Sequence, residues 1–136
     1  AEQKATAKYL TQFDAINNYL TGFKTSVYER LSRIYHGILA LKDKGYQVDA
    51  IAPQAAIYLT IKFDLTGKTK PDGTPLAQQS DVTQYLLEAA GLAIVPFSSF
   101  GGSKASPWYR LSVGTCHLSD VEPMFARLEA ALKGLS

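Results

Sequence analysis

The sequence predicts an α+β domain, in which helices cover a small sheet of three to four mostly antiparallel strands. Two patterns in the 136 residues support this fold class. Apolar residues near the start recur at helical spacing, and shorter stretches further along alternate between apolar and polar side chains as strands do. The predicted order is helix, strand, helix, strand, strand and helix, and the first helix is either one long helix or a bent pair.

Nine apolar residues with gaps of three or four predict the N-terminal helix: Phe13, Ile16, Leu20, Phe23, Val27, Leu31, Ile34, Ile38 and Leu41. Two lysines followed by Gly45 suit its C-terminal end. About 40 helical residues would measure roughly 60 Å, whereas a domain of this length has a radius of gyration of about 14 Å. We therefore expect the helix to break, near residues 11 to 14 or at Gly22, or to project beyond the domain.

A linker, a strand and a loop are predicted next. Residues 46 to 53 form a linker with a possible short strand. Residues 55 to 63 alternate and predict a half-buried strand, with Ile57, Leu59, Ile61 and Phe63 on its apolar side. Residues 64 to 79 are polar and contain two prolines and an Asp-Gly pair. A loop of that length in a compact domain is either functional or mobile.

A helix and two strands follow. Ser80 and Asp81 start the helix and Gly91 ends it. Its apolar face is expected to hold Val82, Tyr85, Leu86 and Ala89. Strands are predicted at residues 92 to 95 and 107 to 113, with a Gly- and Ser-rich loop, residues 96 to 106, between them.

The last helix is predicted from a capping box, Ser119 with Glu122, and from apolar residues at helical spacing up to Gly134. The domain organisation that we expect is a linking helical segment, residues 1 to 45, followed by an α+β core, residues 46 to 136.

Composition argues against several classes of protein. A net charge of +2 with scattered basic residues gives little reason to expect a nucleic-acid partner. The longest apolar run is about six residues, far below the roughly 20 of a membrane helix. The single Cys116 cannot form an intramolecular disulfide, which favours a reducing, cytoplasmic location. The N-terminus has neither the apolar core of a signal peptide nor a starting Met, so we expect a processed chain or a piece of a longer one.

Arg110 is the main candidate for a functional residue. In the strand that contains it, Tyr109, Leu111 and Val113 share one face, which leaves Trp108, Arg110 and Ser112 on the other. Arginine keeps its charge in proteins, so within a strand it needs either water or an anionic partner. Two interpretations stay open: a solvated residue on the wet face of the sheet, or a guanidinium that binds a carboxylate or phosphate.

The other chemically active residues give weaker signals. Lys104 lies in a loop that matches neither the phosphate-loop nor the dinucleotide pattern, and we expect it to be a surface lysine. Cys116 and His117 are adjacent, so their side chains diverge, and His36 fits the surface of the first helix. With two histidines and one cysteine no metal site is expected, and no carboxylate pair stands out.

Three stretches together resemble the C-terminal part of aminotransferases of the pyridoxal-phosphate fold-type I superfamily, in the aspartate aminotransferase group. APQAAIYLTIKF is similar to the family's P-x-G-A-F-Y-L-F strand. YLLEAAGLAIVPFSSFG is similar to its L-L-x-x-A-G-V-A-V-x-P-G-x-x-F-G segment, and WYRLS with the helix after it to its Y-x-R-L-S strand and closing helix. The first helical region resembles the helices that join the large cofactor domain to the small one. Phe97 and the Gln54-Ala55 pair depart from the pattern.

The resemblance implies substrate-binding roles for two residues. Arg110 corresponds to the family's arginine that binds the α-carboxylate of the amino acid, and Phe100 to the F-G turn near the substrate entrance. The whole enzyme would use pyridoxal phosphate, act on amino acids and 2-oxo acids, and form a homodimer. The family's cofactor lysine, phosphate-binding residues and pyridinium aspartate belong to the large domain and have no match here, so we expect this part alone to be inactive.

Two rival hypotheses stay open beside the aminotransferase. One is a free-standing module that binds an anion through Arg110 and the loop of residues 98 to 106. The other is an assembly domain that uses its long first helix to bind a partner.

Overall fold

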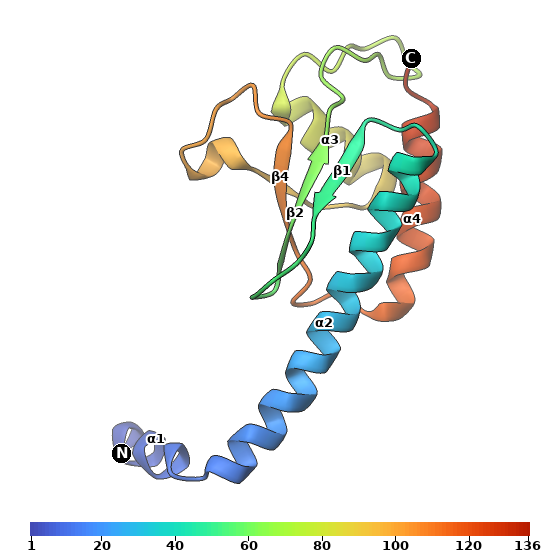
Figure 1. The fold of residues 1–136 in the computed structure, drawn as a ribbon. Coiled ribbons are helices and arrows are strands. Elements are labelled where there is room, and N and C mark those ends of the chain that lie inside the picture. Colours follow the sequence, from blue (N-terminus) through green and yellow to red (C-terminus); the bar gives the residue numbers. More distant parts are fainter.

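Helices lie against one face of a four-stranded sheet, and a long helix extends from this body in the computed structural model, which describes residues 1–136 (Figure 1). The elements are α1 (Glu2–Leu10), α2 (Phe13–Asp43), β1 (Val48–Ile51), β2 (Tyr58–Phe63), α3 (Gln79–Ala90), β3 (Val95–Pro96), the 3-10 helix η1 (Phe97–Phe100), β4 (Trp108–Ser112) and α4 (Leu118–Lys133). No helix is both long enough and apolar enough to cross a membrane.

The sheet has the order β1-β2-β4-β3, and each neighbouring pair of strands is antiparallel. The predicted α+β class is confirmed, and the possible short strand in the linker is formed as β1. The strand predicted at residues 92 to 95 is wrong in extent, because only Val95 and Pro96 pair with β4. Leu92 and Ile94 bury their side chains outside any strand, and the chain turns into η1 at Phe97.

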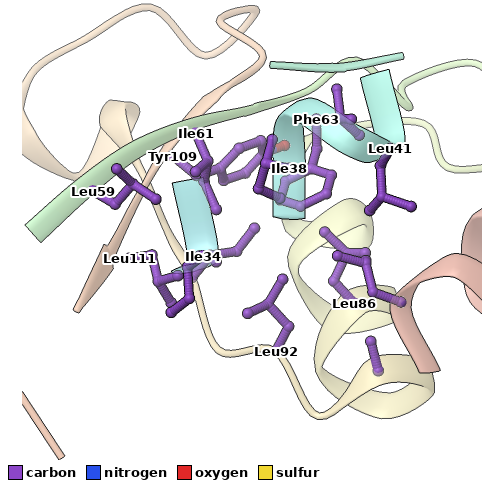
Figure 2. Close-up of a cluster of buried hydrophobic side chains, with 14 of the residues drawn as sticks. Ile34, Ile38, Leu41, Leu59, Ile61, Phe63, Leu86, Leu92, Tyr109 and Leu111 are labelled. Carbon is purple, nitrogen blue, oxygen red and sulfur yellow. The ribbon is translucent and has the colours of Figure 1, made fainter. Parts of the chain in front are cut away.

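The core lies between the sheet and the helices, and Figure 2 shows its centre. The predicted alternation in β2 and β4 is confirmed: Leu59, Ile61, Phe63, Tyr109 and Leu111 are all buried on the helix side. From the second half of α2, Val27, Leu31, Ile34, Ile38 and Leu41 are buried against them. The opposite face of the sheet has no α-helix over it (Figure 1).

The first helical region is expected from its length either to break or to project, and it does both. The break lies at Thr11 and Gln12, within the first of the two predicted places, whereas Gly22 lies inside the regular helix α2. Every residue from 1 to 25 is exposed except Ile16, which is half-buried. The N-terminal half of α2 therefore extends away from the core, and α1 lies at its far end, turned at an angle to it (Figure 1).

Both later helices begin earlier than predicted, because an aspartate in the first turn accepts the N-terminal hydrogen bonds. In α3 the Asp81 carboxylate accepts bonds from the backbone N–H of Ala77 and Gln78, at 3.0 and 3.1 Å. In α4 the Asp120 carboxylate accepts a bond from the N–H of His117 at 3.3 Å, so the predicted Ser119–Glu122 box is wrong. These aspartates also suit the positive end of the helix dipole.

Two further differences concern α3 and the loop before it. The predicted apolar face of α3 is wrong at one position: Ala89 is exposed and Ala90 is buried. In the loop of residues 64 to 79, Leu65 and Leu76 are buried, and Thr69 exchanges backbone hydrogen bonds of 3.0 and 3.2 Å with Ser136. This loop is therefore attached to the core and to the C-terminal residue.

Candidate functional site

Arg110 lies in the middle of β4, on the face of the sheet that no α-helix covers. Thr60 of β2 and Val95 of β3 lie directly opposite it on the two neighbouring strands. Arg110 itself is half-buried, while the residues before and after it, Tyr109 and Leu111, point into the core. The strand alternation thus fixes the direction of the guanidinium, as the sequence predicts.

Two aromatic rings hold the guanidinium of Arg110. Its carbon Cζ lies 4.4 Å from the ring centre of Tyr58 and 4.0 Å from that of Phe100. Tyr58 belongs to β2 and Phe100 to η1 just after β3, so the rings approach from the two sides of β4. Each is a cation–π contact, which stabilises the charge and restricts the orientation of the side chain.

The acidic residues of the chain leave Arg110 without a partner. The four ion pairs are Arg33–Glu29, Lys42–Asp49, Lys44–Glu129 and Lys62–Asp64. Arg110 forms no ion pair, and its guanidinium donates no hydrogen bond to a protein atom, unlike those of Arg30 and Arg127. A half-buried arginine with free N–H donors between two rings can bind a carboxylate through two parallel hydrogen bonds.

The segment after β3 carries Phe100, and a buried amide connects this segment to α3. The Oε1 atom of Gln79 accepts a hydrogen bond of 2.6 Å from the hydroxyl of Ser98, and its Nε2 donates to the carbonyl of Ser106. The 3-10 turn ends at Gly101, whose φ of 86° favours glycine. Gly102 follows, where a Cβ atom would lie 2.9 Å from the carbonyl oxygen of Phe97.

The remaining candidates do not join this site. Lys104 is exposed, as predicted. Cys116 is half-buried, and burial raises the pKa of its thiol, which disfavours the reactive thiolate. His117 begins α4, and His36 on α2 places Nδ1 2.8 Å from the carbonyl oxygen of Ser32. No three His, Cys, Asp or Glu side chains lie together as metal ligands.

Sequence reasoning missed Tyr58 and Gln79. Tyr58 pairs with Ser112 in the antiparallel register, one diagonal step from Arg110, and the pattern had pointed instead to Trp108 and Ser112 as neighbours. The alternation of β2 does place Tyr58 on the uncovered face. The strand pattern does not give the register of β2 against β4, which is what brings Tyr58 beside Arg110. Gln79 gave no signal, because a helix-start glutamine is ordinarily exposed.

Comparison with known proteins gives one consistent result. No family model matches the chain. Among curated proteins, an aspartate aminotransferase of Rhizobium meliloti (strain 1021) is 33% identical over 90 residues, which are 65% of this chain and 21% of that enzyme. A second from Rhizobium meliloti is 29% identical over 112 residues, 82% of this chain and 25% of the enzyme. The crystal structure of the aspartate aminotransferase from Rhizobium meliloti superposes with a TM-score of 0.73 and 29% identity, covering 87% of this chain and 28% of that one.

The chain is a relative of the fold-type I aminotransferases. The fold alone extends to an α-aminoadipate aminotransferase from Thermus thermophilus, with a TM-score of 0.67 and 19% identity over 93% of this chain and 29% of that one. The chain spans about a fifth to a quarter of the length of the curated aminotransferases that it matches, with shares of 21% and 25%. The resemblance seen in the motifs is thereby confirmed for one part of an aminotransferase.

Proposed function

We propose that this chain is the small C-terminal domain of a pyridoxal-phosphate-dependent aminotransferase, in which Arg110 binds the α-carboxylate of the amino-acid substrate. The observation that carries the proposal is the free guanidinium on the uncovered face of the sheet, 4.0 and 4.4 Å from two ring centres and without an ion-pair partner. Because the chain is related to aminotransferases, the anion that we propose for this arginine is the α-carboxylate of an amino acid.

The role of the chain in the enzyme follows from where Arg110 lies. A guanidinium presents its donors in a plane and can grip both oxygens of a carboxylate, which fixes the position of the attached Cα atom. Such orientation is a large part of catalysis when the reaction needs one bond of the substrate to be aligned. The uncovered face would lie toward the rest of the enzyme, and closure of this domain would enclose the substrate.

The anchor of the cofactor would lie elsewhere in the enzyme. Pyridoxal phosphate supplies the electron-withdrawing ring of transamination, and the lysine that holds it must have its pKa lowered, commonly by desolvation. Every lysine of this chain is exposed or half-buried, which supports placing the cofactor lysine in another part of the enzyme. We further propose a homodimeric, cytoplasmic enzyme that exchanges an amino group between an amino acid and a 2-oxo acid, with this part inactive alone.

The direct test is the substitution Arg110→Ala in the full-length enzyme. Hydrogen bonds to a charged group contribute about 1.5 to 3 kcal/mol, so we expect KM for the amino acid to rise roughly 10- to 100-fold. Arg110→Lys should restore only part of this, because a lysine cannot form the paired contact. Arg33→Ala on the exposed surface of α2 is the matched control and should leave KM unchanged. An unchanged KM in Arg110→Ala would disprove the assignment.

A second candidate function is a free-standing carboxylate-binding module. The specific observation in its favour is that the donors of Arg110 are already free in this chain. Titration of the 136-residue chain with succinate separates the two functions. A module should bind it with a Kd well below about 1 mM, whereas one isolated guanidinium contact corresponds to about 1 mM or weaker.

A further inference from the structure

We propose that Gln79 is a positioning residue of the Arg110 site, which acts by holding the segment of residues 98 to 106 so that Phe100 stays against the guanidinium. Gln79 itself lies outside the contacts of Arg110, which are made by Tyr58 and Phe100. The inference rests on the function proposed for Arg110, and it adds the residues that determine how well the guanidinium is oriented.

The burial of Gln79 shows that its amide is structurally specific. It is 7% exposed, and apart from two tyrosines every other one of the 25 buried residues is wholly apolar. Burying an amide costs free energy unless its hydrogen bonds are made. Here both ends are satisfied, Oε1 by the hydroxyl of Ser98 at 2.6 Å and Nε2 by the carbonyl of Ser106. One side chain at the start of α3 thus binds two separated points of the segment.

Phe100 lies in the sequence between Ser98 and Ser106, and these two attachment points hold its part of the chain in place. The residue is 48% exposed, so burial in the core does not fix its ring. At the start of η1, just before the segment, Phe97 contacts the ring edge-on, with 6.2 Å between ring centres, and its carbonyl accepts a 2.9 Å hydrogen bond from the N–H of Gly102. These bonds keep the turn compact, and the Gln79 amide attaches the turn to the body of the protein.

The expected consequence concerns the freedom of the arginine. With rings on both sides of β4, the guanidinium is held close to one orientation and its N–H edge stays available to a ligand. Without the Phe100 ring, Arg110 regains rotamers that it must lose again on binding, which weakens binding by roughly threefold to tenfold. Loss of the Gln79 amide should have the same effect through the same ring.

The test measures Arg110 directly by NMR in the 136-residue chain. Ring currents of Tyr58 and Phe100 should shift the side-chain protons of Arg110 upfield, and sodium acetate serves as the carboxylate probe. Gln79→Leu keeps the size and burial of the side chain but removes both hydrogen bonds, and Phe100→Leu removes the ring alone. Gln84→Leu is the matched control, because Gln84 is an exposed glutamine of the same helix.

We expect Gln79→Leu and Phe100→Leu each to reduce the upfield shift and to weaken acetate binding by roughly threefold to tenfold. The double variant should be no weaker than Phe100→Leu, since both act through one ring. Gln84→Leu should match the wild type. A wild-type Arg110 shift in Gln79→Leu, or additive effects in the double variant, would overturn the inference. If Gln79→Leu does not fold, Ser98→Ala removes one of the two bonds and is judged by the same Arg110 shift.

Failure of the proposed function would look different. In that case acetate would bind equally to the wild type and to Arg110→Ala, while the Arg110 proton shifts would still report whether Gln79 positions the ring. In the full-length enzyme Gln79→Leu should raise KM for the amino acid and leave kcat within about twofold, because the loss concerns binding. A merely structural defect would lower the amount of active enzyme and leave KM unchanged.

Discussion

Tyr109 places a polar atom in the core without a partner. Its side chain is fully buried, packs edge-on against Phe63 with 6.2 Å between ring centres, and its hydroxyl has no hydrogen-bond partner (Figure 2). Tyr85 is the natural comparison, because it is also buried but donates a 2.7 Å hydrogen bond to the carbonyl of Ala131. The same chemical group is thus unsatisfied at one position and satisfied at the other.

This contrast predicts opposite effects of the same substitution. Tyr109→Phe removes an atom whose desolvation costs about 1 to 3 kcal/mol, so the free energy of unfolding should stay the same or increase. Tyr85→Phe removes a satisfied hydrogen bond and should lower the free energy of unfolding by about 1 kcal/mol. Denaturant unfolding of both variants measures the difference. A Tyr109→Phe variant that is less stable than Tyr85→Phe would contradict the assignment of the partners.

Tyr109 also predicts how stability falls at alkaline pH. Burial, with a smaller contribution from Asp64, raises the pKa of its hydroxyl from 10.0 to about 12. The folded state therefore holds this proton more tightly than the unfolded state, so the stabilisation is complete below pH 10 and is lost as pH rises toward 12. Over this window the wild type should lose up to about 1.4 kcal/mol per pH unit more than Tyr109→Phe. Parallel stability curves for the two proteins would refute this.

Residue directions within one strand could be predicted, but contacts between strands could not. The alternation around Arg110 placed it opposite Tyr109 and Leu111, and burial confirms this. Tyr58 and Phe100 reach Arg110 from segments 52 and 10 positions away in the chain. Such contacts depend on strand register and on the shape of the loop, which local patterns do not encode. The role of Arg110 in binding stays a prediction.

At the scale of elements, α2 and α4 approach closely at a glycine. A Cβ atom on Gly37 would lie 2.3 Å from the ring of Phe125 on α4. Gly22 lies in the same helix, and a Cβ atom there would meet nothing within 4 Å. The two glycines therefore have different reasons for being in a helix: the first makes room for a neighbouring helix, and the second has no contact that requires it.

We predict that alanine acts in opposite directions at these two glycines. Gly22→Ala should stabilise α2 by roughly 0.5 to 1 kcal/mol through the better helix propensity of alanine. Gly37→Ala gains the same propensity but forces the Phe125 ring aside, and overpacking costs about 1 to 3 kcal/mol, so the net effect should be destabilising. Thermal unfolding of the two variants compares them. The double variant Gly37→Ala/Phe125→Leu should recover stability, and a Gly37→Ala variant as stable as Gly22→Ala would contradict the close packing.

The helices were predictable as elements, but their first residues were not. Apolar periodicity gave α2, α3 and α4, because the core needs one continuous apolar stripe on each. The N-termini of α3 and α4 lie one or two residues earlier than predicted, because the carboxylates of Asp81 and Asp120 accept hydrogen bonds from backbone N–H groups that precede them. Serine, the preferred capping residue, stood nearby in both cases and misled the prediction. β3 was overestimated because buried apolar residues need not belong to a strand.

At the scale of the whole molecule, apolar side chains are exposed on the extended N-terminal helices. Seven of the twelve exposed large hydrophobic residues lie between residues 9 and 28: Tyr9, Leu10, Phe13, Tyr19, Leu20, Phe23 and Tyr28. Phe13, Leu20 and Phe23 continue the face that is buried from Val27 onward. A cavity of about 450 Å³ between α2 and the connection from β1 to β2 extends this apolar surface past Phe23.

The size of this surface decides what it does in solution. Aromatic side chains carry roughly 150 to 250 Å² each, so the exposed fractions add up to several hundred Å² over α1 and the N-terminal half of α2. A monomer rarely exposes an apolar patch larger than about 300 to 600 Å² without a partner, and a standard interface buries about 800 Å² on each side. In the proposed enzyme the rest of the polypeptide would cover this face. For the 136-residue chain alone, a second copy of the chain can supply the apolar surface that covers this face.

We therefore predict that the 136-residue chain self-associates through the N-terminal half of α2. Sedimentation at increasing concentration should show a monomer–dimer equilibrium. Each buried apolar side chain contributes about 1.5 to 3 kcal/mol, so Leu20→Ser/Phe23→Ser should weaken association by at least about tenfold. Asn18→Ser/Thr25→Ser is the control, because these exposed residues lie away from the apolar face.

The stability of the core gives a second check on this prediction. The Leu20→Ser/Phe23→Ser variant should keep the wild-type free energy of unfolding, since both residues lie before Val27, the first buried residue of α2. A chain that stays monomeric up to about 1 mM would show that this face does not pair with a second copy.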